Sequence, residues 1–426
     1  MTVYLIGTLD TKGREIGFVR DLLRGYGVET QVIDAGSGPP PVIQPDITRE
    51  AVFQAAGTTF AAIQAQGDRG TAVTQAAAGV AKLIGDWHAR GQVQGVLGLG
   101  GSAGTTIATA AMRALPIGIP KLMVSTLASG QTRPYVGDKD ILLLNSVVDL
   151  IGINRISREV LGAAARAMAG LVTLPAPPPA ASERPLIAAT MFGVTTPCVE
   201  QAREILEAAG YEVLVFHATG NGGMAMESLI ADGLIAGVLD ITTTELADEL
   251  VGGTLSAGPL RLTAAGRRGI PQVISVGALD MVNFGPRETV PVQFSSRKFH
   301  VHNANVTLMR TTPDENRQLG EEIARKAADA TGSVSILLPL LGVSAIDKAG
   351  QPFDDPASRQ ALCDAIRRQH GSVELVQMNN HINDAAFASA AANKLLELLN
   401  RRPGPTAEVQ RRFSGGSAIA KPWAAS

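Results

Sequence analysis

Short apolar runs recur along the chain, and each is followed by a loop rich in glycine, serine or threonine and then by a helical pattern. The runs cover residues 3–6, 31–33, 96–99 and 121–124 in the first half and 186–190, 212–216, 235–239 and 272–276 in the second. Continuous apolar strands of this length are typical of a parallel sheet covered by helices on both faces. The alternation of strand and helix predicts right-handed β-α-β units. The pattern therefore predicts an α/β fold with two Rossmann-like, doubly wound parallel-sheet domains.

A proline-rich segment divides the chain. Residues 175–185 read PAPPPAASERP, which cannot continue a helix and favours an extended connector. We therefore predict an N-terminal nucleotide-binding domain over residues 1–174, a linker over 175–185 and a C-terminal Rossmann-like domain over 186–400. Residues 401–426, which contain RRPGP and SGGS, are predicted to form a tail.

The most informative loop is GLGGSAGT at residues 98–105, between the third apolar run and a helical pattern at 106–114. Glycines let the backbone turn tightly and approach an anion, and the amides at a helix N-terminus attract negative charge. We predict that this loop holds a phosphate or carboxylate through Gly100, Gly101, Ser102, Gly104 and Thr105. In the alternative interpretation, the glycines only let the helix pack closely on the strand. The loop is not a Walker A motif, because no Gly-Lys-Ser/Thr follows.

Other loops of the first half are expected at the same edge of the sheet, because the carboxyl ends of parallel strands lie together. The residues predicted to complete the site are Thr8, Asp10, Lys12, Gly13, Asp34, Thr126, Ser129 and Gly130. Lys12 supplies a positive charge for phosphate. Asp34 ends the second run, where an acidic residue commonly meets a ribose hydroxyl. Asp10 has an alternative role as a helix N-cap.

The second half carries more titratable groups at its predicted strand ends. Thr219, Gly220, Gly222 and Gly223 are predicted to form a second anion site. The candidate acid–base groups are His217, Asp240, Glu245, Asp280, His300 and His302. If residues 300–302 are extended, both imidazoles share a face. The alternative is that these are hydrogen-bonded groups that line a domain interface. No metal site is predicted, because no spacing such as HExxH occurs.

Composition narrows the class of protein. The chain of 426 residues has 37 basic and 39 acidic residues, so it has no overall basic field, and nucleic acid is not expected as a partner. No stretch approaches the roughly 20 apolar residues of a membrane span. The two cysteines, Cys198 and Cys363, are far apart and do not indicate disulfides. Cys198 is predicted in the first turn of a helix, either as an activated thiol or as a small buried residue. A cytoplasmic location is expected.

Several longer motifs resemble one known family. They are GTLDTKG at 7–13, GLGGS at 98–102, VSTLASG at 124–130, HATG at 217–220, ALDMVNFG at 278–285 and HN at 302–303 with TLMR at 307–310. These segments are similar to the ATP-binding region of the tomato mosaic virus resistance protein and its bacterial relatives, over about residues 1–400. The resemblance implies two Rossmann-like domains, ATP binding in the N-terminal half and a homodimer or higher homo-oligomer. In the plant protein this region binds a viral replication protein, an activity that looks specialised.

Two functions follow from these patterns. The first is an ATP-binding cytosolic protein that holds the nucleotide phosphates, with or without Mg²⁺, on the glycine-rich loops of the N-terminal domain. The alternative is an enzyme, such as a phosphotransferase or an acid–base lyase or hydrolase, that acts on a small anionic metabolite in the cleft between domains. The polar residues at the strand ends of the second half favour this alternative.

Overall fold

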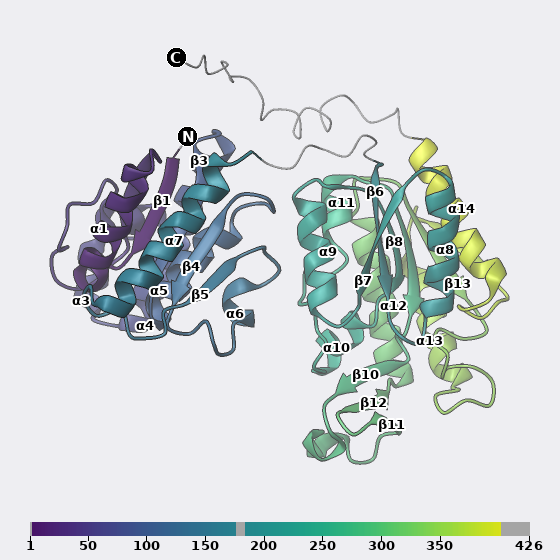
Figure 1. The fold of residues 1–426 in the computed structure, drawn as a ribbon. Helices are drawn as coiled ribbons and strands as arrows, with labels where there is room; N and C mark the ends of the chain where they lie inside the picture. The colour runs from purple at the N-terminus through teal and green to yellow at the C-terminus, as the bar shows by residue number, and fades with distance from the viewer. Residues whose placement is uncertain (1, 176–183, 402–426) are drawn as a thin grey trace. The chain divides into compact units, whose positions relative to one another are not determined.

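The computed structural model describes residues 2–175 and 184–401. The chain forms two compact units, residues 1–180 and 181–426, each built on its own parallel sheet (Figure 1). Most of the predicted linker 175–185 and nearly all of the predicted tail lie outside the described residues. Each unit is therefore described by itself.

Unit 1 contains a five-stranded parallel sheet in the order β2-β1-β3-β4-β5. Its strands are β1 (Thr2–Gly7), β2 (Thr30–Asp34), β3 (Val93–Gly100), β4 (Lys121–Ser125) and β5 (Leu142–Asn145). The helices are α1 (Leu9–Gly25), α2 (Arg49–Ala55), α3 (Phe60–Gln66), α4 (Arg69–Ala89), α5 (Ser102–Arg113), α6 (Arg133–Val136) and α7 (Arg155–Thr173). The four apolar runs of the first half are β1 to β4. The edge strand β5 was not predicted.

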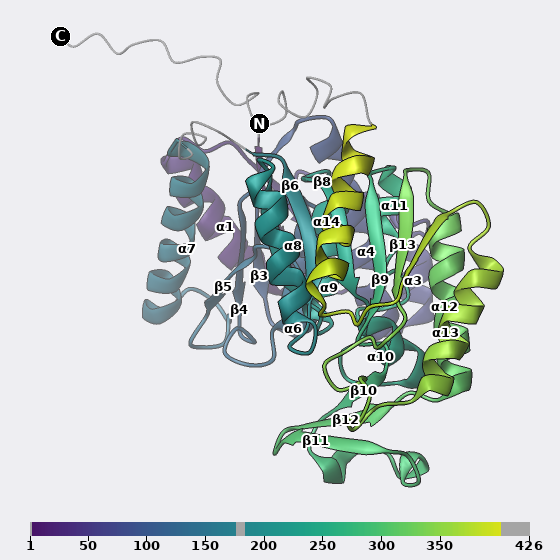
Figure 2. The ribbon, with the colours of Figure 1, turned by 90° about the vertical axis from the view of Figure 1, so that its right-hand side faces the viewer.

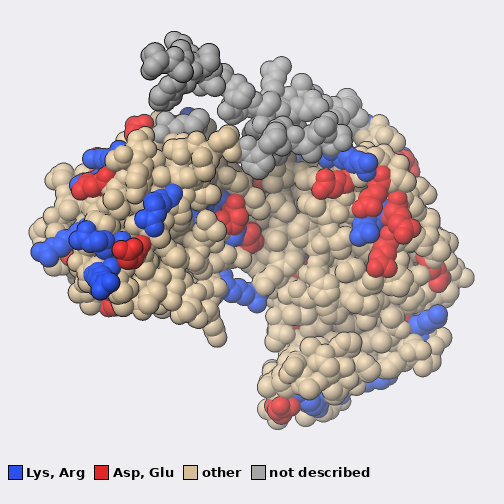
Figure 3. Space-filling view, in the orientation of Figure 1, with Lys and Arg blue, Asp and Glu red and all other residues tan. Residues whose placement is uncertain are grey.

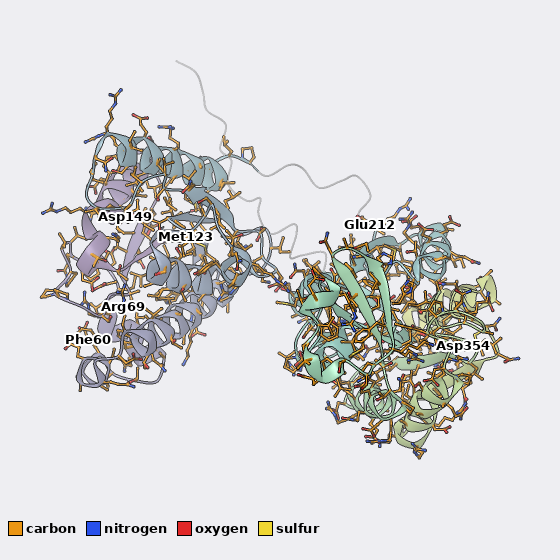
Figure 4. The ribbon with its side chains drawn as sticks, turned by 90° about the horizontal axis from the view of Figure 1, so that it is seen from below. Phe60, Arg69, Met123, Asp149, Glu212 and Asp354 are labelled. Atoms are coloured by element: carbon orange, nitrogen blue, oxygen red, sulfur yellow. The ribbon has the colours of Figure 1, made fainter. Side chains whose placement is uncertain are left out.

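The helices cover both faces of this sheet, which explains the continuous apolar strands. In β1, Val3 and Leu5 pack with α1 and α7, whereas Tyr4 and Ile6 pack on the opposite face with α2, α4 and α5. Met123 of β4, labelled in Figure 4, belongs to this second core. The doubly wound parallel sheet expected from the sequence is thereby confirmed.

Unit 2 contains a six-stranded parallel sheet in the order β14-β13-β9-β8-β6-β7. Its strands are β6 (Leu186–Met191), β7 (Glu212–His217), β8 (Ile235–Thr242), β9 (Gln272–Gly277), β13 (Val334–Pro339) and β14 (Glu374–Met378). The helices are α8 (Thr196–Ala208), α9 (Asn221–Ala231), α10 (Glu245–Val251), α11 (Ala264–Arg268), α12 (Pro313–Ala328), α13 (Pro356–Gln369) and α14 (Ala385–Asn400). Helices α8 and α14 lie side by side on one face (Figure 2). The runs of the second half are β6 to β9.

A small antiparallel sheet, which was not predicted, is inserted between β9 and β13. It consists of β10 (Met281–Phe284), β11 (Phe299–Asn303) and β12 (Val306–Arg310) in the order β10-β12-β11. Two short 3₁₀ turns, η1 (Arg287–Thr289) and η2 (Val292–Phe294), connect β10 to β11. The small sheet lies beyond the carboxyl ends of the large sheet, near α10 (Figure 1).

The surface carries charges of both signs. On the face shown in Figure 3, acidic and basic side chains are interspersed, and much of the surface is uncharged. Within the described ranges, no helix is long and apolar enough to cross a membrane.

Candidate functional site

The candidate site of unit 1 lies where the strand order reverses, at the carboxyl ends of β1 and β3. Ligands of open α/β sheets bind outside the sheet at this switch point. The ends of β3 and β4 are joined there, because the amide of Thr126 donates to the carbonyl oxygen of Gly100 at 3.3 Å. The sequence therefore places the glycine-rich loop at the topological position that favours ligand binding.

Three glycines of this loop region are needed for packing. A Cβ atom at Gly98 would overlap the side chain of Ala108 in α5. A Cβ atom at Gly100 would lie 2.7 Å from the Cα of Gly104, and one at Gly104 would lie 2.9 Å from the carbonyl oxygen of Leu99. For these three residues the close-packing interpretation is sufficient, since only glycine lets α5 approach β3 so closely.

Gly101 has a different environment. A Cβ atom there would meet only the hydroxyl of Thr126, at an ordinary distance of 3.6 Å. Gly101 is the N-cap of α5, and its carbonyl accepts the first intrahelical bond, from the amide of Thr105 at 2.8 Å. The amides of Ser102, Ala103 and Gly104 precede that bond, so they have no acceptor inside the helix. Within the described part of the chain, these amides donate to no backbone carbonyl outside the helix, and Gly101 provides no side chain to cap them.

The hydroxyls around the loop divide into two groups. The Thr105 hydroxyl is buried and shares a 2.7 Å hydrogen bond with Ser125, whose hydroxyl also accepts from the amide of Leu127 at 3.0 Å. Thr105 therefore ties α5 to β4. Thr126 is half-buried, whereas Ser102, Ser129 and Gly130 are exposed. Only this second group is open to a ligand.

The loop after β1 contributes groups that already have partners. The hydroxyls of Thr8 and Thr11 are 2.7 Å apart, and the ammonium of Lys12 donates to the carbonyl oxygen of Leu150 at 2.5 Å. The N-cap of α1 is Thr8, so the alternative that Asp10 caps this helix is wrong. Instead, Asp10 Oδ2 accepts from the amide of Gly38 at 2.7 Å.

Gly13 of the same loop is buried inside α1. A Cβ atom at Gly13 would lie 3.0 Å from the Cβ of Val42. The structure therefore gives Gly13 a packing role, between α1 and the segment that follows β2.

Asp34 is buried at the end of β2, with both carboxylate oxygens occupied. Oδ1 accepts from the amides of Leu9 at 3.1 Å and Gly36 at 2.9 Å, and Oδ2 accepts from Nε of Arg49 at 2.7 Å. In this structure Asp34 joins the loop after β1 to the loop after β2.

In unit 2 the predicted second anion site already holds an anion of the protein itself. Oε1 of Glu245 accepts from the amides of Gly220 at 2.7 Å and Gly223 at 3.0 Å. A Cβ atom at Gly222 would overlap the carbonyl of His217, and the Thr219 hydroxyl donates to that same carbonyl at 3.3 Å. The loop after β7 is therefore satisfied internally.

Glu245 and Asp240 are paired with Arg261, which the sequence did not single out. The Arg261 guanidinium is fully buried and donates to Asp240 at 2.5 and 2.7 Å and to Glu245 at 2.7 Å; Glu227 lies 3.4 Å away. Burial alone would lower the pKa of Arg261, but the three carboxylates, led by Asp240, raise it well above its ordinary value. No sequence pattern distinguishes Arg261 from exposed arginines.

Asp280 is fully buried in a separate network. Its Oδ2 accepts from the hydroxyl of Ser344 at 2.8 Å, whereas its Oδ1 has no partner among the described residues. Burial, and next the charge of Asp347, raises the pKa of Asp280 to about 7. Asp248, which the sequence did not single out, also has its pKa raised to about 7 by burial, against the hydrogen bonds from Asn283 that lower it.

The three predicted histidines lie apart from these carboxylates. His217 is exposed at the end of β7, with its ring centroid 5.5 Å from that of Phe192. His300 and His302 lie in β11, so the expected extended segment is present, and His300 meets the edge of Phe353 at 6.3 Å. In the described ranges, none of the three makes a hydrogen bond or ion pair with Asp240, Glu245 or Asp280.

A buried histidine that was not predicted, His381, lies in the Asp280 network. Its Nε2 is 2.8 Å from the carbonyl oxygen of Ser344, and its Nδ1 accepts from the amide of Asn383 at 3.1 Å. Two backbone partners hold this imidazole in one orientation. No three His, Cys, Asp or Glu side chains in residues 2–175 and 184–401 group into a metal site.

Both cysteines belong to the hydrophobic cores. Cys198 occupies the first turn of α8, as predicted, but it is fully buried, and burial raises its pKa to about 12. The interpretation as an activated thiol is therefore wrong. Burial likewise raises the pKa of Cys363 in α13 to about 11.

Comparisons with known proteins assign the chain to a family. A family model for the N-terminal domain of the uncharacterised protein family UPF0261 matches residues 1–177, and the C-terminal domain model matches residues 184–399. A UPF0261 protein from Clostridium tetani is 50% identical over 401 residues, which cover 94% of this chain and 99% of the relative.

Two tomato proteins extend these similarities. The ToMV resistance protein Tm-1(GCR237) of Solanum lycopersicum is 49% identical over 313 residues, 71% of this chain and 41% of its own length. The ToMV susceptible protein tm-1(GCR26) is 40% identical over 93% of this chain and 55% of its own length. A solved structure of a putative UDP-N-acetylglucosamine 2-epimerase from Listeria monocytogenes covers 99% of both chains at 14% identity, but its TM-score of 0.21 is too low to support a conclusion. The family models and the relatives agree: this chain belongs to the UPF0261 family.

Proposed function

We propose that unit 1 binds ATP and holds its phosphates on the amides of Ser102, Ala103 and Gly104. One observation carries the proposal: these three amides donate to no acceptor among the described residues, and a Cβ atom at the neighbouring Gly101 would meet only the Thr126 hydroxyl, at 3.6 Å. Unpaired amides and the dipole of a twelve-residue helix favour an anion.

The surroundings of this loop support a phosphate ligand. Ser102, Ser129 and Thr126 present hydroxyls that are exposed or half-buried. The Lys12 ammonium donates to the backbone carbonyl of Leu150, and since an ammonium has three N–H donors, it can also bind a phosphate oxygen. The loop also lies at the switch point of the sheet, where ligands of this architecture bind.

The choice of ATP among anions rests on the resemblance to the tomato mosaic virus resistance family, which implies ATP in the N-terminal half. The homo-oligomer that the same resemblance implies stays a prediction. We include no reaction in the proposal, because Asp240 and Glu245 are held by Arg261, and Asp280 is fully buried.

The test is a calorimetric titration of the full chain with ATP, with and without Mg²⁺, repeated on Gly101→Asp. The Cβ atom of the variant has room and aspartate is a favoured N-cap, so the variant is expected to fold. Its carboxylate repels phosphate and competes for the same amides. We expect ATP affinity to fall at least tenfold.

A matched control is Gly25→Asp at the exposed end of α1. A Cβ atom there would meet nothing within 4 Å. Gly25 is the last residue of α1, so it lies at the end of that helix away from the carboxyl end of β1. This control is expected to bind ATP like the unmodified protein. Equal affinities of Gly101→Asp and the unmodified protein would remove the α5 loop from the proposal.

A further inference from the structure

A cavity of about 310 Å³ opens at the carboxyl end of β2, beside the loop that follows this strand. Its wall includes Pro40, Pro41, Pro45, Phe60 and Gln64, with the ion pair of Asp34 and Arg49. Phe60, at the start of α3, is labelled at the periphery of unit 1 in Figure 4. The volume lies within the usual range of small-molecule sites.

Arg49 gives this cavity unused hydrogen-bonding capacity. Only 4% of the residue is exposed, and its Nε donates to Asp34 at 2.7 Å while Nη1 donates to the carbonyls of Gly38 at 2.8 Å and Pro39 at 2.9 Å. Nη2 has no partner among the described residues. A guanidinium carries two N–H groups on that nitrogen, and buried donors are normally paired, so an acceptor is expected to complete the site.

The charge and polarity of the wall favour an uncharged, partly apolar group. Asp34 neutralises Arg49, and the guanidinium lies 5.2 Å from the ring centroid of Phe60. The exposed carboxylate of Glu50 also lines the cavity, so the wall disfavours a phosphate there. The prolines and Phe60 supply apolar contacts. Exposed amides of Gln44 and Gln64 at the wall can pair with the edge of a base, as Gln does with adenine N6 and N7.

The cavity also lies at a suitable distance from the phosphate loop. Only β1 separates β2 from β3, so the ends of these two strands are about 10 Å apart. An extended nucleoside triphosphate is long enough to span them. We infer that this cavity holds the nucleoside end of the nucleotide, with Arg49 Nη2 donating to a ring nitrogen or a ribose oxygen. The inference rests on the proposed function.

This assigns Asp34 a positioning role. Its carboxylate holds Arg49 through Nε and fixes the loop through the amides of Leu9 and Gly36, so the ligand meets Arg49 instead of the aspartate. In this inference Asp34 does not make the ribose contact that the sequence predicted. Asp34 instead holds Arg49, and Arg49 contacts the nucleoside.

The experiment compares two probes on the full chain, ATP and inorganic tripolyphosphate, which lacks the nucleoside. Gln64→Trp, on the wall of the cavity, is expected to weaken ATP at least tenfold and to change tripolyphosphate affinity less than twofold. Gln66→Trp is the matched control, because Gln66 is exposed on the same helix but does not line the cavity. It is expected to change neither affinity.

The outcomes separate the inference from the proposed function. If the unmodified protein binds both probes with the same affinity, or if Gln64→Trp leaves ATP binding unchanged, the nucleoside lies elsewhere and only the inference is overturned. If the unmodified protein binds neither probe, the proposed function fails, and the inference fails with it. Arg49→Lys keeps the charge beside Asp34 but removes the Nη2 donors, so weaker ATP binding with intact thermal stability would support the inference a second time.

Discussion

The two units contain glycine-rich loops that are alike in sequence but differ in whether a group of the protein binds their backbone amides. After β3, the amides of Ser102 to Gly104 have no acceptor in the described residues. After β7, the amides of Gly220 and Gly223 are bound by Glu245, a carboxylate 22 residues beyond Gly223 in the chain. In unit 2 the protein itself therefore supplies the anion that the loop amides bind. An anion on the loop after β3 stays a proposal.

The difference teaches how to interpret such loops. Glycine content reports only that the backbone approaches something closely. At Gly98, Gly100 and Gly104 it approaches a helix or strand, and at Gly223 a carboxylate. At Gly101 a Cβ atom would make only an ordinary contact with the Thr126 hydroxyl, at 3.6 Å. A substitution that adds one methyl group can therefore distinguish packing glycines from ligand-facing ones.

The largest effect is expected from Arg261→Met in unit 2. The change leaves the buried carboxylates of Asp240 and Glu245, and the half-buried Glu227, without their common partner, which costs about 3–5 kcal/mol for a broken buried ion pair. We expect unit 2 to unfold at much lower denaturant or to fail to fold, measured by chemical denaturation. Arg317→Ala, which breaks an exposed pair with Asp314, is expected to change stability by less than about 1 kcal/mol. Similar stabilities of the two variants would contradict the structural role of Arg261.

A pair of alanine substitutions tests the glycines of unit 1. Gly100→Ala places a methyl group 2.7 Å from the Cα of Gly104 and is expected to destabilise unit 1 by about 1–3 kcal/mol. Gly101→Ala has room for its methyl group, so only the lower preference of alanine for an N-cap opposes it, and it is expected to cost no more than about 0.5–1 kcal/mol. Thermal denaturation of both variants measures the two losses of stability. Equal losses would show that Gly101 is also a packing residue.

The stability of unit 2 is expected to depend on pH through its buried carboxyls. Asp248 and Asp280 have pKa values raised to about 7, so the folded state holds their protons more tightly than the unfolded state. The stabilisation from these groups is then complete below about pH 4, is lost as pH rises from there toward 7, and levels off above the folded-state pKa. A contribution of about 1 kcal/mol would lower Tm by about 2–4 °C between pH 5 and 8.

Variants separate this effect from other titrations. Asp280→Asn imitates the protonated carboxyl and is expected to flatten the pH dependence of Tm. Glu200→Gln, at an exposed position of α8, is expected to leave it unchanged. If Tm of Asp280→Asn changes with pH as steeply as Tm of the unmodified protein, ionisation of Asp280 does not destabilise the folded state.

The smallest effect is expected from thiol reagents. Cys198 lies at the N-terminal turn of α8, where the helix dipole would lower a thiol pKa, but burial raises it to about 12. At pH 8 we expect neither Cys198 nor Cys363 to react with iodoacetamide in the folded protein, and both to react in denaturant. Mass spectrometry of the labelled protein provides the measurement, and rapid labelling of native Cys198 would contradict the burial argument.

Much of the fold was accessible from the sequence because local pattern and tertiary burial agree there. The eight apolar runs are β1 to β4 and β6 to β9, since a strand covered on both faces must be apolar throughout. The other strands were missed. β5 and β14 are partly exposed edge strands, and β10 to β12 form a small antiparallel sheet. β13 was also missed, although it is a buried apolar strand like the eight that were predicted.

The sequence by itself determined two parallel sheets with glycine-rich turns at their carboxyl edges, because apolar periodicity and glycine position are local properties. The tertiary structure alone decided which turns stay open. Glu245 accepts from the amide of Gly220, and the buried Arg261 donates to Asp240. Arg49 donates to Asp34 through Nε, and its Nη2 has no partner among the described residues. These pairings depend on segments 15 to 25 residues apart along the chain being brought together, and no local pattern encodes which polar group will find which partner.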